Sequence, residues 1–155
     1  MIHFAALAKG SGVDTRRLKT IARKLLKEVN EGGSSLSISL VDDGAIRELN
    51  REHRGKDKPT DVLSFPLYEA GEHGLGEEER LLGDIVISID TARRQAADYD
   101  APLQQEIYRL LIHGVLHVLG HDHEDPAERA AMEAEERRLA AAIGMPWPYD
   151  DDART

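Results

Sequence analysis

The residues best suited to chemistry lie in one short stretch, residues 110–123, which reads LLIHGVLHVLGHDH. His113 and His117 are four residues apart in an otherwise apolar run, so on a helix they share one face, one turn apart. Gly120 ends the helical pattern, and His123 follows shortly after it. Neutral imidazoles are preferred ligands of zinc and similar ions. The stretch therefore predicts a metal site at the end of a buried helix, with these three histidines as its ligands.

Three protein ligands leave one coordination position open, which is the pattern of a catalytic rather than a structural zinc site. An ion held in this way lowers the pKa of a bound water or polarises a carbonyl or phosphoryl oxygen. We expect one Zn²⁺ ion, and imidazole ligands also suit nickel and other divalent metals. His121 and Asp122 lie beside the turn and are candidates for orienting a ligand, not for binding the metal.

The same stretch resembles the zinc-peptidase motif H-E-x-x-H-x-x-G-x-x-H, with Gly120 at the glycine position. Gly114, however, occupies the position of the catalytic glutamate. Without that general base the peptidase mechanism is not supported. A metallopeptidase-like amide hydrolase is therefore kept only as an alternative, and we expect Gly114 to leave space beside the metal for a bulky substrate group.

A second group of charged residues precedes a predicted strand, in the stretch HRGKDKPTD at residues 53–61. Arg54 offers a planar guanidinium suited to phosphate, and Lys56 and Lys58 add positive charge for substrate binding. The stretch also holds two carboxylates that are candidates for orienting the arginine, Asp57 and Asp61. Taken alone, these residues are also typical of a solvated loop rich in turns.

Three segments together are similar to those of one known family: N-x3-RGKDKPTDVLSFP at residues 50–66, GDI at 83–85, and HG-x-LH-x2-GHDH at 113–123. They resemble the YbeY family of single-domain bacterial endoribonucleases, which are implicated in ribosomal RNA maturation and ribosome quality control. The resemblance covers nearly the whole chain in the same order. It implies a zinc-like ion held by His113, His117 and His123, a functional arginine at Arg54, and a small mixed sheet with helices around it.

The combined interpretation is a metal-dependent endoribonuclease that acts on single-stranded RNA in ribosomal RNA maturation and ribosome quality control. We expect the reaction to depend on Arg54 and His117, with Arg54 binding the phosphate and stabilising the charge that develops on it. The general base stays open, because the 2′-hydroxyl of RNA can itself be the nucleophile. Expected partners are ribosomal RNA and the ribosome. A ribosome assembly factor whose metal is structural is the remaining alternative.

Composition limits the class of protein. The chain has 155 residues, no cysteine and a formal net charge of −9. This length predicts one domain over residues 1–155, and the lack of cysteine excludes a disulfide-linked partner and fits a cytoplasmic location. No apolar run reaches the length of a membrane span. The negative charge argues against nucleic acid, but residues 14–30 carry six basic and two acidic side chains, enough for one basic face.

Apolar periodicity predicts four strands and five helices. The strands are expected at residues 2–7, 35–41, 62–67 and 84–89. The helices are expected at residues 15–29, 45–51, 91–99, 102–119 and 126–143. This order predicts the α+β class: a small mixed four-stranded sheet covered by about five helices. A loop rather than a helix joins the last two strands, which favours an antiparallel pair.

Several local features refine these boundaries. Asp14 or Thr15 is expected to cap the first helix, Asp90 or Thr91 the third, and Asp125 the last. Pro66 indicates that its strand ends there or lies at an edge of the sheet. Two segments are expected to be poorly ordered, a mobile loop at 69–80 and a partly frayed tail after about residue 146.

Overall fold

The computed structural model describes residues 1–67, 80–122 and 124–149. It contains four strands and five helices, so the α+β class and the four-stranded mixed sheet are confirmed. The strands are β1 (Ile2–Leu7), β2 (Ser35–Val41), β3 (Val62–Pro66) and β4 (Leu81–Ser88). The helices are α1 (Thr15–Glu28), α2 (Asp43–Arg54), α3 (Ile89–Asp98), α4 (Leu103–Val118) and α5 (Pro126–Ala142).

The sheet has the order β1-β2-β4-β3. β1, β2 and β4 are parallel, and β3 runs antiparallel to β4, which confirms the antiparallel pair predicted from the short connection. β3 is an edge strand, so Pro66 lies where a residue without a backbone N–H is tolerated. Among the described residues, no strand pairs with the outer side of β3, the strand that follows the charged segment.

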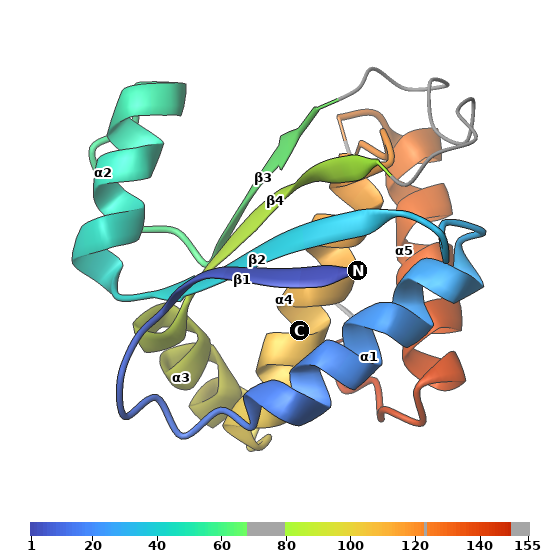
Figure 1. Ribbon diagram of the computed structural model, residues 1–155, viewed down its shortest axis with the longest axis horizontal. Helices are drawn as coiled ribbons and strands as arrows, with labels where there is room; N and C mark the ends of the chain where they lie inside the picture. The colour runs from blue at the N-terminus through green and yellow to red at the C-terminus, as the bar shows by residue number, and fades with distance from the viewer. Residues whose placement is uncertain (68–79, 123, 150–155) are drawn as a thin grey trace.

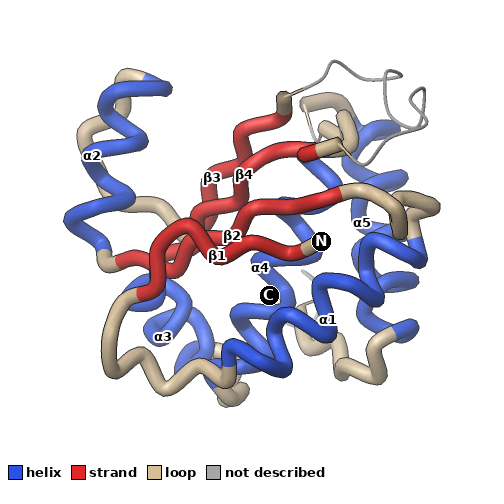
Figure 2. Tube along the Cα trace, viewed as in Figure 1, coloured by secondary structure: helices blue, strands red, loops and turns tan. Residues whose placement is uncertain are grey.

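Helices cover the two faces of the sheet unequally (Figures 1 and 2). The main core packs α1, α3, α4 and α5 against one face, which includes Ile38, Ile85 and Ile87. On the other face Ile46 of α2 packs with Leu63 and Val86 in a small separate cluster. Because neighbouring residues of a strand point to opposite faces, α2 and α4 lie on opposite sides of the sheet.

Most helix starts agree with the capping residues expected. The side chains of Asp14 and Asp125 accept hydrogen bonds from the backbone N–H groups of Arg17 and Glu128. The expected cap of the third helix is wrong: Ser88 caps α3, and the helix begins at Ile89. The last residue of β4 is itself the cap, so the strand leads directly into the helix and no turn marks the boundary.

Residues 147–149, the described part of the expected tail, pack against the rest of the domain. Tyr149 is buried, and its ring lies 4.6 Å from the ring of Tyr99 and 5.1 Å from that of Trp147. Burial of Tyr149 and its contacts with the partly buried rings of Tyr99 and Trp147 hold residues 147–149 against the domain. Residues 150–155, and residues 69–79 of the expected mobile loop, lie outside the described residues. Among the described helices, none is long and apolar enough to cross a bilayer.

Candidate metal centre and phosphate-binding segment

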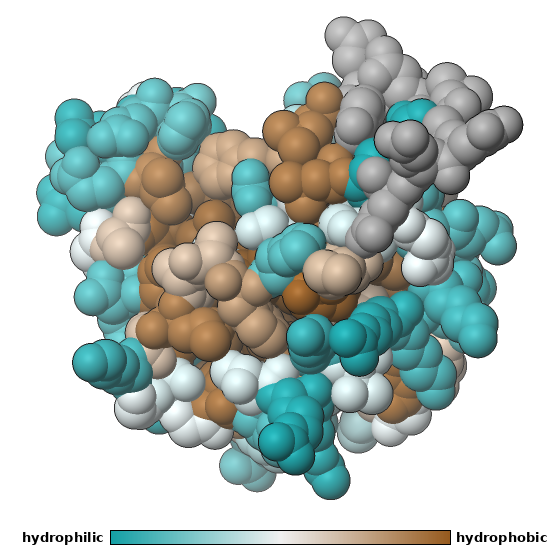
Figure 3. Space-filling model, in the orientation of Figure 1, coloured by the Kyte–Doolittle hydropathy of each residue, from teal (hydrophilic) through white to brown (hydrophobic). Residues whose placement is uncertain are grey.

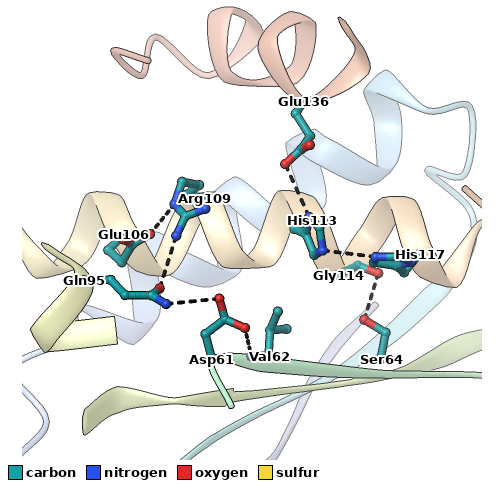
Figure 4. Close-up of polar contacts among 10 residues, drawn as sticks. All are labelled: Asp61, Val62, Ser64, Gln95, Glu106, Arg109, His113, Gly114, His117 and Glu136. Atoms are coloured by element: carbon teal, nitrogen blue, oxygen red, sulfur yellow. Dashed lines mark hydrogen bonds and ion pairs between the residues drawn. The ribbon is translucent and has the colours of Figure 1, made fainter. Parts of the chain in front are cut away.

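The two helical histidines lie together on α4, near its C-terminal end. The Nε2 atoms of His113 and His117 are 3.0 Å apart, and the ring centroids are 4.5 Å apart (Figure 4). Nine residues of this helix are buried, whereas both imidazoles are partly exposed. The helix is therefore held rigidly in the core while its two imidazoles remain accessible to a ligand or substrate.

A carboxylate from another helix orients this pair. Glu136 of α5 is 8% exposed, and its Oε2 lies 3.4 Å from Nδ1 of His113. A proton on Nδ1 that is donated to this carboxylate leaves Nε2 of His113 unprotonated, which is the state required of a metal ligand. With His113 in that tautomer, the bond between the two Nε2 atoms takes its proton from His117, and a metal ion would replace that proton.

Glu136 is not among the site residues predicted from the sequence, although it lies within the apolar face of its helix. The buried residues of α5 include Met132, Glu136, Leu139 and Ala140, which are spaced along one helical face. A carboxylate in the middle of such a face needs a polar partner in the core. What the sequence could not supply is the identity of that partner, because it lies 23 residues away.

The residues present fit a metal ion. Two nitrogens bound at about 2.0–2.1 Å to one tetrahedral ion lie about 3.3 Å apart, close to the spacing observed between His113 and His117. His123, the third expected ligand, lies outside the described residues. In the part of the chain that the structure describes, no set of three histidine, cysteine, aspartate or glutamate side chains is arranged to hold an ion.

Gly120 reverses the chain directly after the helix. It has φ of +100°, its N–H binds the carbonyl of His117, and the N–H of His121 binds the carbonyl of Leu116. This pair of bonds is a Schellman turn, which requires the left-handed backbone that glycine adopts without strain. The turn sends His121 back toward α5, where it lies near Glu135. The pKa of the Glu135 carboxyl is lowered mainly by its hydrogen bond with Arg138 and, to a smaller extent, by His121.

Gly114 has a different role from the one we expected. A Cβ at this position would lie 2.8 Å from Cγ2 of Ile85 on β4, so the glycine allows α4 to approach the sheet closely. The carbonyl oxygen of Gly114 also accepts a hydrogen bond of 3.3 Å from Ser64 of β3. The expectation of space for a substrate group is therefore wrong, because the sheet fills that space. A catalytic glutamate could not be placed here without moving the helix.

Arg54 lies on α2, on the other side of the sheet. The helix predicted to end at about Arg51 continues to Arg54, and Gly55 ends it with φ of +68°. The neighbouring His53 ring lies 5.0 Å from the ring of Phe65 on β3. Arg54 is therefore an exposed side chain at a fixed helix end beside the edge strand, and the structure does not bring it into direct contact with the histidines.

The segment after Arg54 is tied to α2. The carbonyl of Lys58 accepts a bond of 2.9 Å from the buried amide of Asn50, and Asp57 pairs with Arg47 at 2.8 Å. The hydrogen bond from Arg47 lowers the pKa of Asp57. The structure thus places Asp57 on Arg47 and not on Arg54. Lys56 and Lys58 are exposed.

Asp61 ties the far end of this segment to the histidine helix. Its Oδ2 accepts a bond of 3.3 Å from Gln95, whose Oε1 accepts one of 3.1 Å from Arg109 of α4 (Figure 4). Arg109 lies one turn before His113 and also pairs with the buried Glu106. Burial raises the pKa of Glu106, and Arg109 opposes this effect.

β3 connects the two groups of residues through adjacent positions. Phe65 faces α2 and touches His53, the neighbour of Arg54, whereas Ser64 faces α4 and binds the carbonyl of Gly114. The α2 end of the charged segment, which carries Arg54, and the histidines therefore lie on opposite faces of one edge strand. A substrate that contacts both has to cross that edge.

Fold and site define a small α+β domain built around a core helix that carries a histidine pair. The model of the family described as endoribonuclease YbeY matches residues 5–144. The chain is 40% identical over 148 residues to a Halorhodospira halophila protein of that description. The aligned region covers 96% of this chain and 95% of the relative. The chain therefore belongs to the YbeY endoribonuclease family.

Further relatives agree with this assignment. A Myxococcus xanthus protein of the same description is 52% identical over 140 residues. The aligned region covers 90% of this chain and 47% of that relative, so this chain spans about half the length of the Myxococcus protein. The solution structure of a Thermotoga maritima protein is similar, with a TM-score of 0.59 and 26% identity over 100% of this chain and 99% of that one.

Proposed function

We propose that this protein is a metal-dependent endoribonuclease that cleaves single-stranded segments of ribosomal RNA during maturation and quality control of the ribosome, in the cytoplasm. Membership in an endoribonuclease family supports the reaction class. The observation that carries the metal dependence is the 3.0 Å approach of the Nε2 atoms of His113 and His117, with Glu136 behind one of them.

In this proposal His113, His117 and His123 hold one divalent ion, with zinc as the first candidate and nickel as another. When bound, the ion would supply a Lewis acid for a phosphate oxygen or a water of lowered pKa. Glu136 keeps the proton of His113 on Nδ1 and so keeps Nε2 available. The partial exposure of both helical imidazoles favours a catalytic over a structural ion.

Arg54 would bind a phosphate of the RNA on the other side of the edge strand, with Lys56 and Lys58 adding charge. In this proposal a flexible single strand passes the outer edge of β3, with which no described strand pairs, on its way from α2 to α4. A rigid duplex bends less readily than a single strand, so this geometry favours unpaired RNA. The general base stays open between the 2′-hydroxyl of the RNA and a protein group.

The peptidase alternative is disfavoured by the packing of Gly114 on Ile85, which leaves no room for the glutamate that this mechanism needs. An amide hydrolase would cut casein in a metal-dependent way and leave structured ribosomal RNA intact. The proposal requires the opposite result, so parallel incubation of the purified protein with both substrates separates the two functions.

The decisive test of the metal is cleavage of precursor ribosomal RNA by His117→Ala and by the wild type after chelation. We expect at least a hundredfold loss of rate in both cases, with recovery of the wild type when Zn²⁺ or Ni²⁺ is returned. His3→Ala, an exposed histidine on β1, is the matched control and should cleave normally. Cleavage that survives both treatments would exclude a metal-dependent nuclease.

Arg54→Ala tests the phosphate contact, and Arg51→Ala is the control because Arg51 lies one turn earlier and pairs with Glu48 at 2.7 Å. We expect about a tenfold or larger loss of kcat/KM for the first variant alone. If the protein is instead an assembly factor with a structural metal, chelation lowers Tm and ribosome binding, while RNA turnover stays at background in every sample.

A further inference from the structure

The exposed face of α1 carries a concentration of positive charge that the proposed active site does not use. Its buried face consists of Leu18, Ala22, Leu25 and Leu26, which pack into the core. The opposite face carries the basic side chains, Arg16, Arg17, Lys19, Arg23, Lys24 and Lys27. In the space-filling view, hydrophilic side chains gather over the position of α1 (Figure 3).

The basic residues near the end of α1 border a hollow of about 590 Å³, whose lining includes Arg23, Lys24, Lys27 and Glu28. The three basic side chains are exposed, and within the described part of the chain none of them forms an ion pair. Glu28 is the only acidic residue of this lining, and it is engaged by Arg138 of α5, with Nη1 3.6 Å from its Oε2. The hollow therefore keeps an excess of positive charge on a chain of net charge −9.

The charges are arranged as a line and not as a point. Arg16, Arg23 and Lys27 recur at spacings of seven and four residues, so they lie along one face of the helix. At a rise of about 1.5 Å per residue this line is about 16 Å long. A line of exposed cations fits a polymer of phosphates better than a single anion, because successive charges meet successive phosphates.

Helix α5 contacts both the lining of the hollow and the histidine pair. Glu136, which binds His113, and Arg138, which binds Glu28 beside the hollow, are two residues apart on α5. The two residues point to different sides of that helix, which is about 10 Å across with its side chains. A single strand that crosses α5 can therefore touch both places.

From this arrangement we infer that the basic face of α1 binds the phosphate backbone of RNA outside the site of cleavage. This inference rests on the proposed RNA substrate, and it adds a second, sequence-independent contact to it. The surface holds the strand that extends beyond the scissile bond, so long RNA gains affinity and a minimal substrate does not.

The test compares two matched double variants. Arg23→Gln/Lys27→Gln removes one arginine and one lysine from the surface, and Lys9→Gln/Arg93→Gln removes the same charge from exposed positions near the β1–α1 connection, where Arg93 binds the carbonyl of Ser11. Binding of a labelled single strand of about 20 nucleotides is measured by fluorescence anisotropy in EDTA, which prevents cleavage, across a salt series.

We expect the α1 variant to bind about tenfold more weakly at about 50 mM salt, with the slope of log affinity against log salt reduced by about 1.4, since each phosphate contact contributes about 0.7. The control should match the wild type. Cleavage of a substrate of about four nucleotides should have the same kcat/KM in all three proteins. Equal slopes for the two variants would overturn the inference.

Two further outcomes are decisive. If the α1 variant loses affinity for a polyglutamate peptide and not for RNA, the surface binds an acidic protein and the inference is wrong. If neither the wild type nor either variant cleaves RNA, but the salt dependence of RNA binding is still reduced only in the α1 variant, the α1 contact stands and the proposed nuclease activity is wrong. The two proposals therefore fail separately.

Discussion

Glu136 orients one imidazole of the histidine pair, because its carboxylate lies 3.4 Å from Nδ1 of His113. Replacement by glutamine keeps the shape and removes the charge that fixes the proton on Nδ1. We expect Glu136→Gln to weaken metal affinity by about 10- to 100-fold, measured by competition with a chelator.

Glu135→Gln is the matched control, because it changes the same charge on the same helix but affects Arg138, 2.8 Å away. Metal affinity in this control should equal that of the wild type. Equal affinities in both variants would show that the contact between Glu136 and His113 does not orient a ligand.

Gly114 shows how packing sets a residue type beside a site. In a helix, alanine is usually better than glycine by about 1 kcal/mol. Here the added Cβ would lie 2.8 Å from Cγ2 of Ile85, so we expect Gly114→Ala to lower the free energy of unfolding by about 1–3 kcal/mol in urea titrations.

The double variant Gly114→Ala/Ile85→Ala isolates this cause. Ile85→Ala alone leaves a cavity in the core, but it also removes the atoms that the new Cβ would meet. The double variant should therefore lose less stability than the sum of the two single variants. Additive losses would mean that the close approach of helix and sheet does not determine the glycine.

At the scale of elements, Asp43 joins the start of α2 to α3. Its Oδ1 accepts bonds of 2.6 Å from Ser88 and 2.7 Å from Thr91, and its Oδ2 pairs with Arg94 at 2.8 Å. Partial burial is the largest single influence and would raise its pKa, but the three hydrogen bonds together lower it. The carboxylate therefore favours the folded state whenever it is ionised.

A carboxyl whose pKa is lower in the folded than in the unfolded state stabilises the folded protein at pH values above its unfolded-state pKa. This stabilisation is lost as the pH falls through the folded-state pKa. We expect Asp43→Asn to be about 1–2 kcal/mol less stable than the wild type at neutral pH, with a smaller difference below about pH 3. Urea unfolding at both pH values measures this. Asp100→Asn, at an exposed turn position, should show little difference at either pH. A difference for Asp43→Asn that is independent of pH would contradict the ionic role.

The arrangement of elements also links the segment after Arg54 to the helix that carries the histidines. β3 places Phe65 on the face of α2 and Ser64 on the face of α4, so one edge strand contacts the neighbours of Arg54 and of His113. Asp61, Gln95 and Arg109 add a second connection between the same two regions. The edge strand and its flanking loop therefore connect the two regions.

At the scale of the whole molecule, the C-terminal segment completes the core. The Tyr149 ring lies 4.6 Å from that of Tyr99 and 4.6 Å from the guanidinium of Arg109, and its hydroxyl accepts a bond of 3.2 Å from Gln105. We expect Tyr149→Ala to cost about 3 kcal/mol in the free energy of unfolding and Tyr149→Phe less than about 1 kcal/mol. Similar small losses in both variants would show that the segment does not stabilise the domain.

Much of this molecule could be predicted from local patterns. Apolar periodicity located all nine elements, and the spacing of His113 and His117 placed them on one helical face, because both depend on residues within a turn or two of each other. The largest boundary errors fell at α2, which continues to Arg54 before Gly55 ends it, and at β4, which begins at Leu81, the partner of Ser35 on β2.

The histidine-bearing helix, the turn at Gly120 and the α+β class could be predicted from the amino-acid order, since each follows from short-range spacing and backbone preference. Three other relations come from the packing of the folded chain: Glu136 faces His113, Ile85 fills the space beside Gly114, and Arg54 lies across an edge strand from the histidines. These relations join residues far apart in the chain. They depend on how helices pack on a sheet, and local sequence patterns do not encode that packing.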